Sequence, residues 1–173
     1  SGETGRRGRD LSARDGRPFV QDAAGDWWRA YLFIERALTH DKIESPEQAR
    51  TAARAFGEFQ RLLADMPGGR LHETIPAFHD TPRRYENLEA AVLADVAGRA
   101  ADCADDLDFV RSRAPLARSL TDLLAAGLVP ERVTHNDTKL NNVMLDETTG
   151  AGGCVIDLDT VMPGYFISDV GDM

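Results

Sequence analysis

The chain has 173 residues, of which 42% are hydrophobic and 28% are charged, which is enough for one folded domain with its own core. Its formal net charge of −9 at pH 7 argues against nucleic acid or an anionic membrane as a partner, because both attract basic surfaces. No apolar run approaches the roughly 18 residues of a membrane span, and no signal-peptide pattern opens the chain. Cys103 and Cys154 are too few for a disulfide framework, so we expect a cytoplasmic protein with both cysteines in its core.

The first 35 residues divide into a leader and a small β-structure. Residues 1–10 are rich in glycine and charge, which predicts a flexible leader. Residues 11–35 carry a "DG" and a "GD" turn signal between apolar stretches, which predicts an antiparallel meander. Its strands are expected at residues 11–14, 17–21 and 27–34.

From Ser45 onward the hydrophobic period becomes that of a helix. Ser45 is a good N-cap, Pro46 suits the first helical position, and Gln48 completes a capping box. A helix of about five turns should therefore end near Pro67. Its inward face should consist of the regularly spaced apolar residues Ala49, Ala52, Phe56, Phe59 and Leu63.

Two further helical regions follow. Thr81 and Pro82 start the second helix, and Pro115 is expected to break the third region, which spans residues 106–126. The inward faces should contain Tyr85, Leu88, Val92 and Val96, and then Leu107, Val110, Leu120 and Leu124. Short strand-like pieces return after Pro130. Because helices and strands are segregated rather than alternating, the sequence predicts an α+β fold and not a Rossmann-type sheet.

The stretch "HNDTKLNN", between two strand-like pieces, contains groups suited to phosphoryl transfer. The carboxylate of Asp137 can accept or orient the proton of an acceptor hydroxyl. Lys139 can neutralise charge on the moving phosphoryl group, and the amide oxygen of Asn142 is a hard ligand for Mg²⁺. A hydrophilic turn is the plain alternative for this stretch taken alone.

A second acidic segment, "VIDLD", ends an apolar strand. A hairpin that joins "NVML" to "GCVI" would bring Asn142 and Asp157 to the same end, and two protein oxygens plus substrate phosphates are the usual environment of Mg²⁺. By the period of two, Asp159 should lie on the same strand face as Asp157, as a ligand of a second metal or as support for the first. The hairpin favours the catalytic interpretation over the hydrophilic turn.

Together, "HNDTKLNNVML" and "VIDLD" resemble the catalytic and metal-binding segments of the aminoglycoside phosphotransferase and choline kinase-like superfamily, relatives of the protein kinases. The segments "VTHNDTKLNNVMLD", "CVIDLDTVMPG", "LHETIPAFHDTP" and "DWWRAYLFIE" closely resemble the N-acetylhexosamine 1-kinases, over about residues 11–173. The resemblance implies a protein-kinase-like fold. It also implies transfer of the γ-phosphoryl group of ATP, with Mg²⁺, to the anomeric hydroxyl of N-acetylglucosamine or N-acetylgalactosamine.

This resemblance assigns roles position by position. It makes Asp137 the catalytic base and Asn142 and Asp157 the Mg²⁺ ligands. It places Lys139 where protein kinases have a phosphate-neutralising lysine. These residues are therefore the expected catalytic and metal-binding set.

The resemblance also implies supporting residues and a nucleotide-binding hinge. His135 would brace the catalytic loop, and Asp169 would do so through backbone N–H groups. A hinge between two lobes, whose backbone would bind adenine by hydrogen bonds, matches Phe33, Ile34 and Glu35. The edge of a buried strand is the alternative for these hinge residues.

Compared with this family, the chain departs at both ends. Residues 11–35 are expected to be a remnant β-meander and hinge of the N-terminal lobe, and residues 36–173 the core of the helical C-terminal lobe, truncated at its C-terminal end. No Gly-rich phosphate-covering loop precedes the meander, and Lys42 and Lys139 are the only lysines. We therefore expect weak or no activity for this chain alone. We also expect self-association through exposed apolar surface.

Three other interpretations stay open. A related kinase would act on choline, homoserine or an aminoglycoside, which a panel of acceptors would separate. A non-catalytic nucleotide-binding module would bind Mg-ATP without turnover. A metal-dependent hydrolase built on His135, Asp137 and Asp157 is the weakest, because no second histidine lies at metal-ligand spacing.

Overall fold

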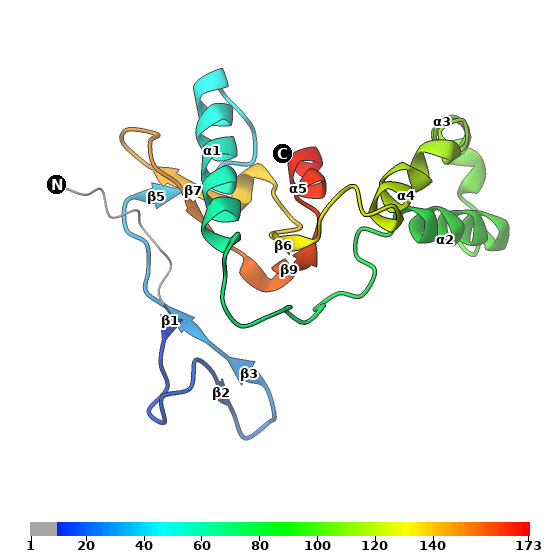
Figure 1. The fold of residues 1–173 in the computed structure, drawn as a ribbon. Coiled ribbons are helices and arrows are strands. Elements are labelled where there is room, and N and C mark those ends of the chain that lie inside the picture. Colours follow the sequence, from blue (N-terminus) through cyan, green and yellow to red (C-terminus); the bar gives the residue numbers. More distant parts are fainter. Residues whose placement is uncertain (1–9) are drawn as a thin grey trace.

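The computed structural model describes residues 10–173. Across these residues the protein is a mixed α/β structure with small sheets and five α-helices (Figure 1). Every strand pair in this part of the chain is antiparallel, in agreement with an α+β arrangement. The predicted leader lies outside the described residues, except for Asp10.

The strands are β1 (Asp10–Leu11), β2 (Val20–Gln21), β3 (Trp27–Trp28), β4 (Ala30–Tyr31), β5 (Ala37–Leu38), β6 (Arg132–Thr134), β7 (Val143–Asp146), β8 (Cys154–Val155) and β9 (Met162–Gly164). The α-helices are α1 (Pro46–Leu63), α2 (Thr81–Ala94), α3 (Ala104–Arg111), α4 (Ser119–Ala125) and α5 (Phe166–Asp172). Short 3₁₀ turns are η1 (Ala100–Cys103), η2 (Ala114–Arg118), η3 (Leu140–Asn142) and η4 (Leu158–Thr160).

The N-terminal strands form one long hairpin rather than the predicted three-stranded meander. β1 pairs with β4 and β2 pairs with β3, so residues 10–21 run antiparallel to residues 27–31. Residues 12–19 loop out between the two paired parts. Of the predicted second strand only residues 20–21 pair, as β2, and Pro18 lacks the N–H group that pairing would need further back. The predicted strand at 27–34 is confirmed in part, since β3 and β4 lie within it, but the pairing is interrupted at Arg29 and stops at Tyr31.

Helix α1 begins and packs as its sequence predicts. The hydroxyl of Ser45 accepts a hydrogen bond from Gln48 N at 3.1 Å, and Gln48 Oε1 accepts one from Glu44 N at 2.7 Å. The inner face of the helix buries Ala52 and Phe56. The core cluster consists of side chains from α1 and β7: Phe56, Val143 and Leu145. Helix α1 therefore covers the sheet β5–β7–β8 that carries the candidate site.

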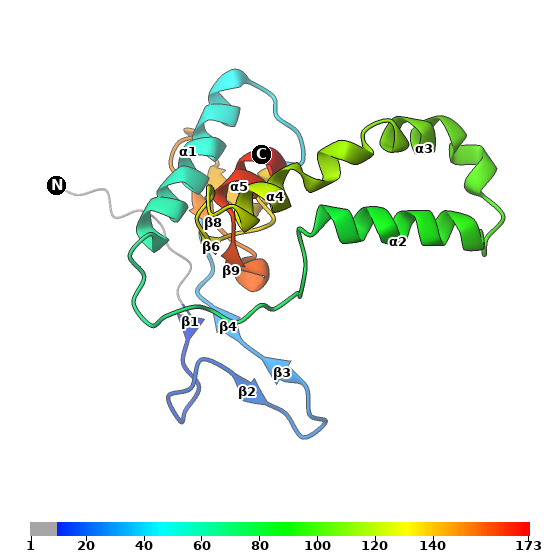
Figure 2. The same cartoon turned by 45° about the vertical axis from the view of Figure 1, so that its right-hand side comes forward.

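Helices α2, α3 and α4 form an arm beside this core. In two views that differ by 45°, α2 and α3 extend away from α1 and the central strands (Figures 1 and 2). Helix α4 lies nearer the core, since Thr121 and Leu124 line a cavity together with Asn136. Helix α2 starts at Thr81 as predicted, with Asp80 as its N-cap. Because it ends at Ala94, the predicted inward residue Val96 lies beyond the helix and is 95% exposed. The break at Pro115 is confirmed, since η2 separates α3 from α4.

A long segment without helix or strand, residues 64–80, joins α1 to α2. In both views it passes beneath the turn that carries η4 and β9 (Figures 1 and 2). The connection is mostly exposed and runs over the surface of the protein beside the turn that carries η4.

The two cysteines differ in their surroundings. Cys154 is buried in β8, as predicted, but Cys103 is exposed at the end of η1, so its predicted core position is wrong. Residue 103 precedes α3 on the outside of the arm, where η1 has no buried face. Within residues 10–173, no helix combines the length and the apolar character needed to cross a membrane.

Candidate active site

The stretch predicted to be catalytic lies between two strand pairs. β6 pairs with β9, and β7 pairs with β8. Residues 135–142, here called the first loop, run from the end of β6 through η3 to the start of β7. Residues 156–161, the second loop, run from the end of β8 through η4 to the start of β9. The two pairings therefore place both loops at one end of the central strands.

The carboxylate of Asp137 is held by two neighbours on the first loop. Lys139 Nζ donates to Asp137 Oδ2 at 2.8 Å, and Asn142 Nδ2 donates to the same oxygen at 2.9 Å. Partial burial alone would raise the pKa of Asp137, but these two hydrogen bonds outweigh it and hold the pKa below its usual value. The bond to Asp137 in turn raises the pKa of Lys139. A carboxylate and an ammonium group therefore stay in contact at neutral pH.

Asn142 and Asp157, the predicted metal ligands, lie at the same end of the β7–β8 hairpin. Ile156 N donates to Asn142 O at 2.9 Å, and Asp157 follows directly. The Nδ2 group of Asn142 donates to Asp137 O and Oδ2, while among the described residues its Oδ1 accepts no hydrogen bond. Asp157 is exposed, and its charge contributes to the raised pKa of Lys139 after the contribution of Asp137.

An amide oxygen and a carboxylate are hard ligands, so this pair fits Mg²⁺. Groups of three or more His, Cys, Asp or Glu side chains that could hold a metal ion do not occur in residues 10–173. A Mg²⁺ ion at Asn142 and Asp157 would therefore take its remaining oxygens from water and a phosphorylated substrate.

Asp159 does not share a strand face with Asp157, so that prediction is wrong. β8 ends at Val155, and the period of two does not continue through the left-handed Asp157 and the turn η4. Arg29 Nη2, from the N-terminal hairpin, forms an ion pair with Asp159 Oδ1. The carboxylate of Asp159 is thus paired with a cation at the surface, and the strand-face argument for a second metal ligand no longer applies to it.

Asp169, in α5, is fully buried and accepts hydrogen bonds from the backbone of the first loop. Its Oδ2 accepts from His135 N at 3.0 Å, and its Oδ1 accepts from Asn136 N at 2.8 Å. Gln60 Nε2 on α1 also donates to Oδ2 at 3.0 Å, and Thr138 Oγ1 donates to Asp169 O at 2.6 Å. One carboxylate therefore connects α1, α5 and the first loop.

The ring of His135 is fully buried between α1 and the second loop. It makes edge contacts with Phe56 and Phe59 at centroid distances of 5.5 and 5.6 Å. Its Nε2 donates to Ile156 O at 2.9 Å, because a carbonyl oxygen can only accept. Thr160 Oγ1 donates to His135 O at 2.7 Å. Through these contacts His135 connects the first loop to α1 and to the second loop.

Asn136 and Gly164 are two further residues at the site that the sequence patterns do not identify: Asn136 joins the two loops, and Gly164 in β9 packs closely against β6 and Asn136. Asn136 has a φ of 66°, and its Nδ2 donates to Thr160 O at 3.0 Å. A Cβ atom at Gly164 would come within 2.6 Å of Asn136 Oδ1 and closer still to Thr134 Oγ1. Asparagine adopts left-handed backbone more readily than most residues, which was a weak local signal. The need for glycine at 164 arises from packing against Asn136 and Thr134, which are 28 and 30 residues away, and has no local signal.

The predicted hinge residues lie on an exposed linker between β4 and β5. Phe33 is 86% exposed, Glu35 is exposed and Ile34 is half-buried. The alternative of a buried strand edge is therefore wrong. The hinge role of Phe33, Ile34 and Glu35 stays a prediction.

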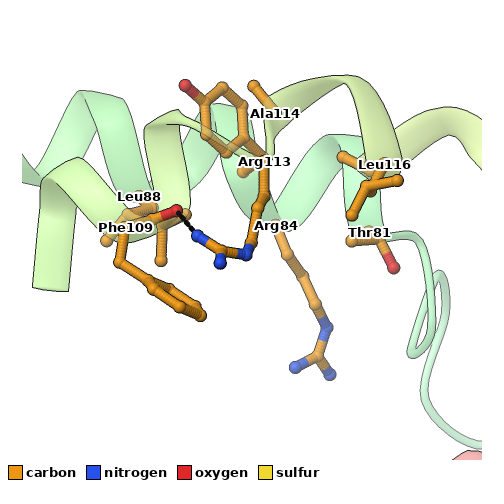
Figure 3. Close-up of a pocket in the computed structure, with 10 residues that line it drawn as sticks. Thr81, Arg84, Leu88, Phe109, Arg113, Ala114 and Leu116 are labelled. Carbon is orange, nitrogen blue, oxygen red and sulfur yellow. Dashed lines mark hydrogen bonds between the residues drawn. The ribbon is translucent and has the colours of Figure 1, made fainter.

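Two cavities lie in different parts of the molecule. One of about 380 Å³ lies in the arm, where Arg113 Nη1 donates to Phe109 O at 3.1 Å and the lining is mostly apolar (Figure 3). It includes none of the predicted site residues. Another of about 220 Å³ is lined by Asn136, residues 162–165 and parts of residues 70–80, so it adjoins the first loop.

The comparison with known families covers nearly the whole chain. The APH family, described as a phosphotransferase enzyme family, matches residues 9–173. This range contains both loops, the hinge segment and Asp169. The protein therefore belongs to the APH phosphotransferase family, whose members are kinase-type enzymes that transfer phosphoryl groups from ATP to small molecules.

Proposed function

We propose that this protein transfers the γ-phosphoryl group of ATP to the anomeric hydroxyl of N-acetylglucosamine or N-acetylgalactosamine, in the cytoplasm. The observation that carries the proposal is the bonded set of Asp137, Lys139 and Asn142 beside the exposed carboxylate of Asp157. The choice of amino sugar rests on the resemblance of "LHETIPAFHDTP" and "DWWRAYLFIE" to the N-acetylhexosamine kinases. Both cysteines are unpaired, which agrees with a reducing compartment.

In this proposal Asp137 orients the acceptor hydroxyl and accepts its proton as the new O–P bond forms. The bond between the γ-phosphorus and its bridging oxygen breaks in the same step, with ADP as the leaving group. The lowered pKa keeps Asp137 ionised at neutral pH and makes it a weak base. A weak base suits a loose phosphoryl-transfer transition state, in which the hydroxyl gives up its proton late. Lys139, in contact with Asp137, neutralises charge on the transferring group.

Asn142 Oδ1 and the Asp157 carboxylate would hold Mg²⁺, which when bound neutralises charge on the phosphates. Asp169 and His135 keep the first loop in place through buried contacts. The exposed linker at residues 33–35 would bind adenine through its backbone. The bonds of Asp137, Lys139 and Asn142 to one another, and those of Asp169 to the first loop, support this assignment of roles.

The test is phosphoryl transfer from Mg-ATP to each amino sugar, with the sugar 1-phosphate detected by ³¹P NMR. Asp137→Asn keeps the shape of the side chain but removes the base, so the rate should fall about 10²–10⁴-fold. Thermal unfolding of both proteins controls for folding. Choline, homoserine and an aminoglycoside serve as competing acceptors.

Each outcome decides between the open interpretations. An amino-sugar phosphate that disappears with Asp137→Asn supports the proposal. Product with another acceptor only would assign a different kinase of the same family. Binding of Mg-ATP without product for any acceptor is the outcome expected of a shortened kinase or a nucleotide-binding module, and it would contradict catalysis by this chain alone.

A further inference from the structure

The segment at residues 70–80 contacts the backbone of both loops, although it lies far from them in sequence. Thr74 Oγ1 donates to Asp159 O in the second loop at 3.1 Å. His79 Nε2 lies 3.2 Å from Asn136 O in the first loop, and since a carbonyl oxygen only accepts, the ring donates. One connection between helices is thus bonded to the residue before the proposed base and to the residue two positions after the proposed metal ligand Asp157.

This segment is itself anchored at both ends. Arg70 donates to both carboxylate oxygens of Glu131, at 2.9 and 3.0 Å, just before β6 begins. At the other end Arg84 Nε donates to Phe78 O at 2.7 Å, and Asp80 caps helix α2. A bidentate arginine–carboxylate pair adds directional rigidity as well as charge. The segment can therefore hold the groups that it contacts.

The bond from His79 acts at a position that controls the direction of Asp137. Asn136 adopts left-handed backbone, with its N–H bonded to the buried carboxylate of Asp169 at 2.8 Å. Its carbonyl group belongs to the peptide unit that joins it to Asp137. The N–H of Asn136 belongs to the preceding peptide unit, so Asp169 holds the plane before Asn136 and His79 holds the plane that leads into Asp137. Together the two bonds fix the backbone angles of Asn136 and hence the direction in which the chain enters Asp137.

We propose that residues 70–80 position both loops for catalysis, with His79 as the positioning residue for the first loop and Thr74 for the second. The kinetic part of this inference rests on the proposed function. The two contacts fall on different loops, so their loss should change different kinetic constants. Loss of the His79 bond misplaces the base, and loss of the Thr74 bond misplaces the metal-binding turn.

The test compares substitutions in the same segment. His79→Phe keeps a ring but removes the donor, and His79→Gln restores an amide donor. Thr74→Val removes the hydroxyl at nearly constant shape. His72→Phe is the matched control, because His72 is exposed in the same segment.

Misplacement of a catalytic group by a distant change reduces the rate strongly, so His79→Phe should lower kcat about tenfold with little change in KM for ATP. His79→Gln should recover most of that loss. Thr74→Val should instead raise the Mg²⁺ concentration needed for half-maximal rate, by a few-fold, with kcat nearly unchanged. His72→Phe should match the wild type. Equal changes in all variants, or changes explained by the folded fraction alone, would overturn the inference.

A second readout does not depend on activity. Hydrogen exchange at the amides of His135 and Asn136, which both donate to Asp169, should be faster in His79→Phe than in His72→Phe. If the wild type transfers no phosphoryl group but this difference is present, the proposed function fails and the bracing of the loop stands. If the two variants exchange at the same rate, the inference fails even for an active kinase.

Discussion

The pKa of Asp137 depends on a few identified contacts, which makes it the most direct property to test at the scale of single residues. Burial is the largest single influence and raises the pKa of Asp137. The hydrogen bonds from Lys139 and Asn142 lower it, and together they keep the pKa below the usual value of an aspartate. Lys139→Met removes a bond and a charge that lower the pKa, so the pKa of Asp137 should rise. A general base acts only when ionised, so activity is present above this pKa and is lost as the pH falls through it.

The acid limb of kcat/KM against pH should therefore lie at higher pH in Lys139→Met than in the wild type. Lys42→Met provides the matched control, since Lys42 is exposed and is the only other lysine. The substitution Lys42→Met should leave the acid limb of kcat/KM at the same pH as in the wild type. An acid limb at the same pH in all three proteins would show that Lys139 does not control the protonation of Asp137.

The spacing of residues in the sequence is sufficient to predict part of the candidate site. Asp137, Lys139 and Asn142 lie within six residues, so any tight loop brings their side chains together, and the structure does so. The contact of His79 with Asn136 joins residues 57 positions apart. No local pattern encodes such a contact, because it depends on how the strands and the connecting segment pack.

At the scale of elements, the close approach of β9 to β6 depends on Gly164. A methyl group there would overlap the side chains of Thr134 and Asn136, which are both buried. Overpacking of a buried site typically costs about 1–3 kcal/mol, so Gly164→Ala should lower the free energy of unfolding by that amount. Denaturant unfolding measures the change.

At Gly57, in contrast to Gly164, there is room for a larger side chain. Gly57 lies within α1, and a Cβ atom there meets nothing within 4 Å. Because alanine is favoured over glycine inside helices by about 0.8–1.0 kcal/mol, Gly57→Ala should stabilise the protein. If Gly164→Ala were as stable as Gly57→Ala, the strands would be further apart than the structure has them.

Local signals predicted helices better than strands. The start of α1 follows from Ser45 and Gln48 because capping bonds join neighbours in sequence. The N-terminal strands were harder, since apolar stretches and turn signals do not specify which strands pair. The structure leaves residues 12–19 unpaired. The period of two also does not show where a strand ends. The sequence therefore predicts Asp159 on a strand face, although the strand ends at Val155.

At the scale of the whole molecule, the N-terminal hairpin is joined to the rest mainly through one ion pair. Among the described residues, Arg29 and Asp159 form the only side-chain hydrogen bond between residues 10–31 and the body of the protein. Both side chains are largely exposed, and such pairs contribute at most about 1 kcal/mol. The hairpin leads directly into residues 33–35, so a weakly held hairpin leaves the proposed hinge able to adjust to a nucleotide.

Exposed apolar side chains on the hairpin and the arm predict self-association. Trp27 is 64% exposed, Phe33 86% and Leu93 90%, and they lie on separate elements. Apolar surface of this kind favours contacts between copies, while the net charge of −9 opposes them. Because salt screens the repulsion but not the apolar attraction, association should increase with both protein concentration and salt.

Sedimentation velocity at increasing protein concentration, in low and high salt, measures this balance. Trp27→Ser and Leu93→Ser, made separately, should each reduce the associated fraction if the surface that they occupy takes part. A reduction from Trp27→Ser alone would assign the contact to the hairpin, and one from Leu93→Ser alone would assign it to the arm. A single monomeric species at high concentration in both salts would show that charge repulsion outweighs the exposed apolar surface.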